Sequence, residues 1–158
     1  EERVVCQSEN FLVIAPYASR FPFELILLPT FHSSHFESSA QDLLSELARI
    51  LKDTANCLDI CLDSPPYNLM LHTAPFTTRK LPFFHWHIEI IPRLTHVAGY
   101  EWGTGFYINQ VLPKEAAEYL RKEIDVADTT NCTPPGRAEN ILRQGGKNER
   151  EDATKERK

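Results

Sequence analysis

Residues 83–93 carry the spacing in this sequence that points most clearly to chemistry. His85 and His87 lie two residues apart in an apolar run, and Glu89 follows two residues later. In an extended strand, residues two apart lie on the same face, so these three side chains are predicted to form one polar row. Burying such groups without partners is costly, so a metal ion, a phosphate or a reacting substrate is the expected partner.

A third histidine, His72, ends the apolar segment 67–72. We expect this segment and residues 83–92 to be neighbouring antiparallel strands, which would bring His72 close to His85 and His87. Three converging histidines predict a divalent metal site, most often for zinc or iron, with a carboxylate or water as a further ligand. The alternative is that each histidine is satisfied by its own hydrogen bond, and the spacing leaves both possibilities open.

Other polar residues near these strands are weaker candidates. His32, His35 and His96 lie in predicted loops, where an exposed histidine needs no ligand. Arg93 follows the histidine strand and is placed either to bind an anionic phosphate or to be an ordinary surface arginine. The glycine-containing stretch 98–106 lacks the spacing and the strand-to-helix context of a dinucleotide fingerprint, so we predict a loop there.

The elements that must position these residues are predicted from apolar periodicity and from proline and glycine breaks. Strands are expected over residues 3–15 with a break at 7–10, then over 23–29, 67–72 and 83–92, with a short one at 106–108; helices are expected over 40–56 and 114–124. A run of strands in meander order, with one helix among them, predicts an α+β fold with an antiparallel sheet.

Composition limits the class of protein. The chain has 158 residues, of which 42% are hydrophobic and 25% charged, and a net charge of −5. This suits one globular domain, argues against a nucleic-acid partner and offers no apolar run of about 18 residues for a membrane span. The charged start of the sequence predicts no signal peptide, so we expect a cytoplasmic protein. Toward the carboxy-terminus, charged residues take the place of bulky apolar ones. We therefore expect a folded domain over 1–125 and a flexible tail over 126–158.

Beyond these patterns, the sequence resembles the galactose-1-phosphate uridylyltransferase family of the histidine-triad superfamily, in the carboxy-terminal half of that enzyme. The resemblance runs from about residue 3 to residue 122. It is carried by Glu9-Asn10-Phe11, Pro16-Tyr17-Ala18, Phe21-Pro22-Phe23-Glu24, Leu27-Leu28-Pro29, Leu71-His72-Thr73-Ala74-Pro75, the stretch from His85 to Arg93, and Ala98-Gly99-Tyr100-Glu101.

The resemblance implies a fold and a metal site. The fold would be an antiparallel half-barrel sheet with helices packed on one side. His72, His85 and His87 match the family's metal-ligand histidines, so zinc or iron is the implied cofactor, and the fourth ligand would be a glutamate of the amino-terminal half. The loop over 97–101 matches the family's hexose-contact loop, with Tyr100 and Glu101 as the expected contacts.

The implied activity is that of a nucleotidyltransferase that exchanges a uridylyl group between UDP-glucose and galactose 1-phosphate. The nucleophile in this family is the second histidine of a His-Pro-His-x-Gln-type motif in the amino-terminal half, and this sequence does not contain that motif. We therefore expect the amino-terminal half of the same enzyme, a second copy of this chain, or both, as partners. A related branch uses ADP-glucose and phosphate, and the sequence does not separate uridylyl from adenylyl preference.

Two alternatives stay open. In stand-alone histidine-triad hydrolases and phosphorylases, the middle histidine of His-φ-His-φ-His is the nucleophile. That position would be His87 here, and Glu89 would replace the last histidine with a carboxylate that repels an incoming phosphate. The other alternative is a non-catalytic, metal-bearing interaction domain that docks through an exposed sheet edge.

Overall fold

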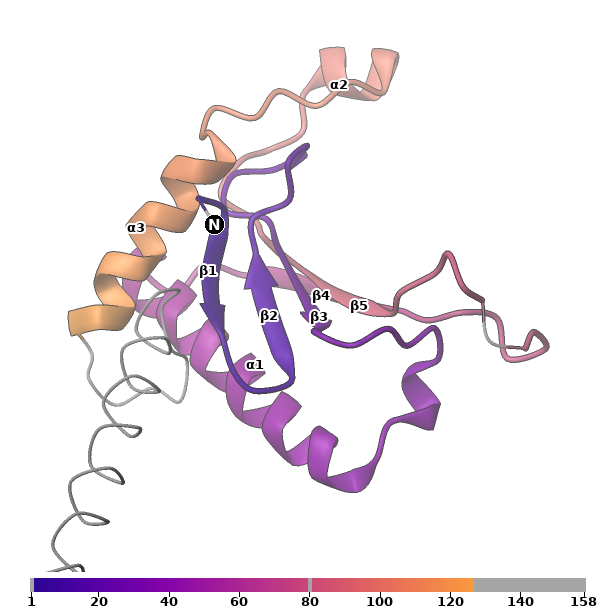
Figure 1. Cartoon of the computed structure of the whole chain (residues 1–158). Coiled ribbons are helices and arrows are strands. Elements are labelled where there is room, and N and C mark those ends of the chain that lie inside the picture. Colours follow the sequence, from indigo (N-terminus) through magenta and orange to yellow (C-terminus); the bar gives the residue numbers. More distant parts are fainter. Residues whose placement is uncertain (1, 80, 127–158) are drawn as a thin grey trace, which may run out of the picture.

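The computed structural model describes residues 2–79 and 81–126. Within this part of the chain, five strands form one antiparallel sheet in the order β1-β2-β3-β5-β4 (Figure 1). The predicted α+β fold with an antiparallel sheet is therefore confirmed. In chain order the elements are β1 (Val4–Gln7), β2 (Phe11–Ile14), β3 (Leu25–Pro29), the 3-10 helix η1 (Phe36–Ser38), α1 (Gln41–Leu62), β4 (Tyr67–His72), β5 (His87–Pro92), α2 (Gly99–Thr104) and α3 (Pro113–Val126).

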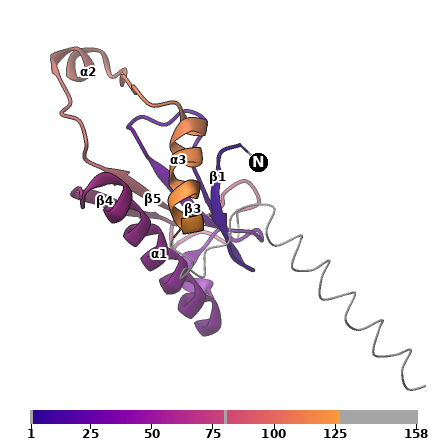
Figure 2. The same cartoon turned by 90° about the vertical axis from the view of Figure 1, so that its left-hand side faces the viewer.

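The hydrophobic core lies on one face of the sheet. Leu25 and Leu27 of β3 lie opposite Ile90 and Ile88 of β5, and all four are buried. Helices α1 and α3 pack against this face and against each other (Figures 1 and 2). They contribute Leu47, Ile50, Cys57 and Leu58 from α1, and Ala117, Leu120 and Ile124 from α3. The opposite face, called the open face here, carries the alternate residues of β5, which begin with His87 and Glu89.

The predicted meander order is wrong at one place. Strand β5 lies between β3 and β4, so β4 follows β3 and α1 in the chain but occupies the edge of the sheet. The physical reason lies in the composition of β5, whose Ile88, Ile90 and Ile91 are buried and suit a central strand with neighbours on both sides. The predicted pairing of the two histidine strands is confirmed, with His72 directly opposite His87.

The histidine strand also begins later than predicted. We expected it to start at residue 83, whereas β5 starts at His87. Its neighbour β4 ends at His72, so the ladder between these two strands ends with the pair His72 and His87. The Trp86 N–H instead donates to the Ser33 carbonyl in the loop after β3, at 2.9 Å. His85 therefore lies just outside the sheet.

Residues 93–112, called the arm here, connect β5 to α3 and project from the sheet (Figure 2). The predicted loop over 98–106 contains the helix α2, which ends at Gly105 with a positive φ of 73°. The strand predicted over 106–108 does not form, because the Ile108 N–H donates to the Glu101 side chain at 3.2 Å rather than to another strand.

The helix predicted over 40–56 continues to Leu62, where the left-handed conformation of Asp63 ends it. Except for Val126, which ends α3, the predicted tail over 126–158 lies outside the described residues. No helix in the described part of the chain has the length and apolar character needed to cross a membrane.

Candidate metal centre

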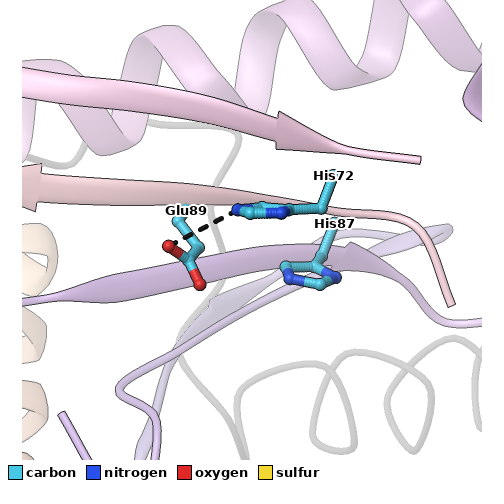
Figure 3. Close-up of side chains that lie close together, drawn as sticks. All are labelled: His72, His87 and Glu89. Atoms are coloured by element: carbon cyan, nitrogen blue, oxygen red, sulfur yellow. Dashed lines mark ion pairs between the residues drawn. The ribbon is translucent and has the colours of Figure 1, made fainter.

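Two histidines and a glutamate gather on the open face where β4 and β5 pair. The imidazole rings of His72 and His87 stack with their centroids 4.8 Å apart and their planes 15° from parallel. The Nε2 atom of His72 lies 3.5 Å from Oε2 of Glu89 (Figure 3). Each of the three residues offers one potential ligand atom, and these atoms lie within 4.8 Å of one another. The cross-strand register places His72 opposite His87, and the alternation along β5 places Glu89 on the same face as His87.

The third predicted ligand, His85, has different neighbours. Its ring packs edge-on against His32, with centroids 5.6 Å apart. Burial lowers the pKa of His85 below its ordinary value of 6.5, and the nearby His32 and His87 lower this pKa further. A hydrogen bond to the Pro29 carbonyl raises the pKa and offsets part of that decrease. His85 therefore stays neutral more readily than a solvent-exposed histidine, and neutral imidazole is the form that binds metals.

The hydrogen bonds of these histidines leave nitrogen atoms available for a metal ion. Nε2 of His72 and Nε2 of His85 are buried and have no hydrogen-bond partner among the described residues. Nδ1 of His87 lies 3.0 Å from the carbonyl of His85, so an Nδ1–H donor there leaves Nε2 as the lone-pair nitrogen. Metal-binding histidines usually hold their second nitrogen in this way. The donor set fits zinc or iron, both of which accept imidazole ligands.

An arginine that we did not single out in the sequence also belongs to this region. Nη2 of Arg20 lies 2.7 Å from Oε2 of Glu89 and 3.0 Å from Oε1 of Glu24. Glu24 is 3% exposed, so it is a buried carboxylate held by this arginine. Arg20 and Glu89 are 69 residues apart, and no local pattern could have indicated the contact.

The loop histidines differ from one another. His35, which we expected to be exposed, is only 8% exposed, and its Nδ1 lies 2.8 Å from the Ser34 hydroxyl. His32 reaches the Leu81 carbonyl at 3.2 Å and supports the ring of His85. His96 is exposed in the arm, as expected.

The remaining candidate residues lie at the other end of β5. Arg93 is exposed and comes six residues after His87, which corresponds to about 20 Å along a strand. Tyr100 is 59% exposed on α2. Both carboxylate oxygens of Glu101 accept hydrogen bonds from the arm's own backbone, from Ala98 N–H at 2.7 Å and from Ile108 N–H at 3.2 Å. The structure does not bring these three residues to the histidines.

Comparison with known proteins agrees with this geometry. Residues 1–125 match the family described as galactose-1-phosphate uridyl transferase, C-terminal domain. The chain is 40% identical over 121 residues to ADP-glucose phosphorylase of Arabidopsis thaliana, covering 75% of this chain and 34% of that protein. It is 36% identical over 135 residues to galactose-1-phosphate uridylyltransferase of Thermotoga maritima, covering 80% of this chain and 42% of that protein. The chain thus spans less than half the length of these relatives.

Solved structures extend the comparison to the fold. The crystal structure of the Arabidopsis ADP-glucose phosphorylase with bound ADP-glucose superposes with a TM-score of 0.73 at 39% identity, covering 75% of this chain and 39% of that one. A zinc-bound histidine triad family protein from Mycobacterium smegmatis superposes with a TM-score of 0.57 at 18% identity, covering 80% and 86%, which shows a shared fold alone. The chain belongs to the family of galactose-1-phosphate uridylyltransferase carboxy-terminal domains, which has the histidine-triad fold.

Proposed function

We propose that this chain is the carboxy-terminal half of a nucleotidyltransferase that acts on a nucleotide sugar and a hexose 1-phosphate. In this role it binds a zinc or iron ion through His72, His85 and His87, and its arm contacts the hexose. The observation that carries the proposal is the pair of buried Nε2 atoms of His72 and His85, which have no hydrogen-bond partner among the described residues. Buried polar atoms normally have a partner, and a metal ion would supply one.

The edge of the sheet supports docking of an amino-terminal half or of a second copy. Among the described residues, strand β4 pairs on one side only, and its Leu69, Met70 and Leu71 are 45%, 36% and 42% exposed. An apolar edge strand with unpaired backbone groups invites another strand or another subunit. Because the matched relatives are more than twice as long as the region they share with this chain, an amino-terminal half is the first candidate for this edge.

The substrate is proposed from the relatives. One curated relative is named for galactose 1-phosphate and uridylyl transfer, the other for ADP-glucose. We propose UDP-glucose and galactose 1-phosphate as the substrates of the whole enzyme, with Tyr100 as a contact to the hexose and Arg93 as a weaker candidate for a phosphate. The two carboxylate oxygens of Glu101 already hold the arm's backbone, so we propose that Glu101 shapes the sugar-contact loop.

The metal site can be tested directly on the chain. Metal-free protein is titrated with zinc in competition with a chromophoric chelator, and we expect one ion per chain. His72→Ala, His85→Ala and His87→Ala should each weaken binding by at least about tenfold. His96→Ala, which removes an exposed histidine from the arm, is the matched control and should leave the affinity unchanged. Full zinc affinity in all three variants would refute the metal site.

A second candidate function is supported by one contact. The hydrogen bond between Nδ1 of His87 and the His85 carbonyl orients Nε2 of His87, as a nucleophilic histidine requires. In that case Nε2 would form a bond to the α-phosphorus of UDP-glucose or ADP-glucose, and the bond to the oxygen of the departing glucose 1-phosphate would break.

Intact mass after incubation with each nucleotide sugar separates the two candidates. We expect no adduct on this chain alone, because the nucleophile is proposed to belong to the amino-terminal half. A gain of one nucleotidyl group that disappears in His87→Ala would instead establish a self-sufficient transferase with His87 as its nucleophile.

A further inference from the structure

Arg20 connects two carboxylates on the open face of the sheet. Its Nη2 donates to Oε2 of Glu89 at 2.7 Å and to Oε1 of Glu24 at 3.0 Å. Its Nε donates to the same oxygen of Glu24 at 3.3 Å. One side chain thus links the loop before β3 to the glutamate that lies beside His72.

Glu24 fixes the position of this arginine. Oε2 of Glu24 accepts the backbone N–H groups of Arg20 at 2.6 Å and Phe21 at 3.1 Å. Phe23 adopts a positive φ of 59°, in the tight turn that brings Glu24 back onto these residues. A buried carboxylate is stable only when it is paired and hydrogen-bonded, so Glu24 strongly favours a guanidinium at this position. Arg20 is therefore anchored at one end while it contacts Glu89 at the other.

Glu89 has the geometry of a metal ligand. Its Oε2 atom is 3.5 Å from Nε2 of His72. The two atoms are close enough together that one zinc or iron ion could bind both of them. However, this is the same oxygen that receives the hydrogen bond from Arg20. A dication bound there would lie close to a guanidinium that is always charged, and the two cations would repel each other.

We propose that Arg20 competes with the metal ion for Glu89 and thereby sets the metal affinity of the site. Arg20 is a positioning residue, since it acts through Glu89. While Arg20 holds Glu89, the histidines bind the ion with Glu89 held back from it. Removing the charge of Arg20 would release Glu89 to bind the ion as a full ligand. This inference rests on the metal site proposed above.

The test compares zinc affinities of variants by chelator competition at constant pH. Arg20→Met keeps an unbranched apolar stem but removes the charge and the hydrogen bonds of the guanidinium, and we expect zinc to bind about tenfold tighter or more. In the wild-type background, Glu89→Gln should change the affinity by less than about threefold. In the Arg20→Met background, Glu89→Gln should abolish the gain, because the gain comes from that carboxylate.

Arg49→Met is the matched control, because it removes one positive charge from the exposed surface of α1. It should leave the zinc affinity unchanged; an equal gain in this variant would assign the effect to net charge and overturn the inference. Equal or weaker zinc binding in folded Arg20→Met would also overturn it. If Arg20→Met fails to fold because Glu24 is left unpaired, Arg20→Met combined with Glu24→Gln removes both charges of the buried pair and should show the same gain.

The two proposals fail in different ways. If His72→Ala, His85→Ala and His87→Ala all bind zinc as tightly as the wild type, the metal site itself is refuted. If His72→Ala weakens binding and Arg20→Met does not tighten it, the metal site stands and only the role of Arg20 is refuted.

Discussion

The two ends of strand β5 lead into regions of opposite character. At its start, Trp86 is 1% exposed, and His87 is half-buried beside His72 and Glu89. At its end, the chain enters the arm, where Trp102 is 79% and Phe106 is 71% exposed. The same short strand therefore joins a packed polar site to a projecting apolar segment.

The difference lies in which residues hold each region. At the start of β5, contacts come from segments distant in sequence, including Ser33 to the Trp86 N–H and His32 to the ring of His85. In the α2 part of the arm, Glu101 binds backbone groups only three and seven residues away. Distant residues hold the far end of the arm, where Asn109 donates to the carbonyls of Ser19 and Phe21 at 3.2 Å. Long-range contacts fix side chains before a ligand arrives, whereas a segment such as α2, in which Glu101 makes only local bonds, opens more easily. The first region suits a metal ion and the second suits a partner surface.

The largest effect on the free energy of unfolding is expected when Trp86, rather than Trp102, is replaced. Trp86 packs against Phe11 and Phe36, with ring centroids 6.1 and 5.1 Å away. Trp86→Ala should lower the free energy of unfolding by about 3–5 kcal/mol. Trp102→Ala, at the other end of β5, should change it by less than about 0.5 kcal/mol. Urea unfolding followed by circular dichroism measures both, and similar losses would remove the contrast between the two ends.

Zinc should stabilise the two ends unequally. At a free concentration of 100 times its dissociation constant, zinc should raise the free energy of unfolding by about 2.7 kcal/mol. Hydrogen exchange should slow around His72 and His87, and amides over 99–108 should exchange at their former rates. His72→Ala should abolish both the stabilisation and the local protection. Equal protection of the arm would show that the two regions are coupled.

The metal-free protein should lose stability on acidification through His85. Its pKa lies below the ordinary value of 6.5, mainly because burial disfavours the charged ring. The unfolded chain therefore takes up this proton more readily. The contribution of His85 is fully present above about pH 6.5 and is lost as the pH falls toward the folded-state pKa.

Unfolding curves in the presence of EDTA at several pH values between 5 and 7.5, roughly the range in which histidines titrate, measure this loss. His85→Gln should flatten the dependence on pH, and His96→Gln, in the exposed arm, should leave it as in the wild type. A slope that survives in His85→Gln would assign the titration to another group.

The smallest effect is expected in the arm. Glu101→Ala removes the acceptors for the Ala98 and Ile108 N–H groups, so these two amides should exchange about tenfold faster. The free energy of global unfolding should change by less than about 0.5 kcal/mol, because the arm contributes little to the core. Glu115→Ala, an exposed glutamate of α3, should leave the exchange of both amides unchanged. A large global loss would mean that the arm is part of the folded core.

Much of the site could be predicted because it depends on local periodicity. Alternation along β5 placed His87 and Glu89 on one face and Ile88 and Ile90 on the other, and both assignments agree with the structure. The neighbouring segment that ends at His72 followed from the same reasoning. The antiparallel α+β architecture was also predicted correctly from the order of apolar segments and breaks.

Other features depend on contacts between distant segments. The position of β5 between β3 and β4 and its start at His87 were both missed. The contact of Arg20 with Glu89 spans 69 residues and has no local signature.

The sequence by itself therefore determined which residues share a face, because the side-chain alternation of a strand is set by its own backbone. Only the tertiary structure decided which strands are neighbours, where the ladder ends and which charge meets Glu89. These three features depend on how loops and helices pack around a common core. The spacing of residues within a single segment carries no information about that packing.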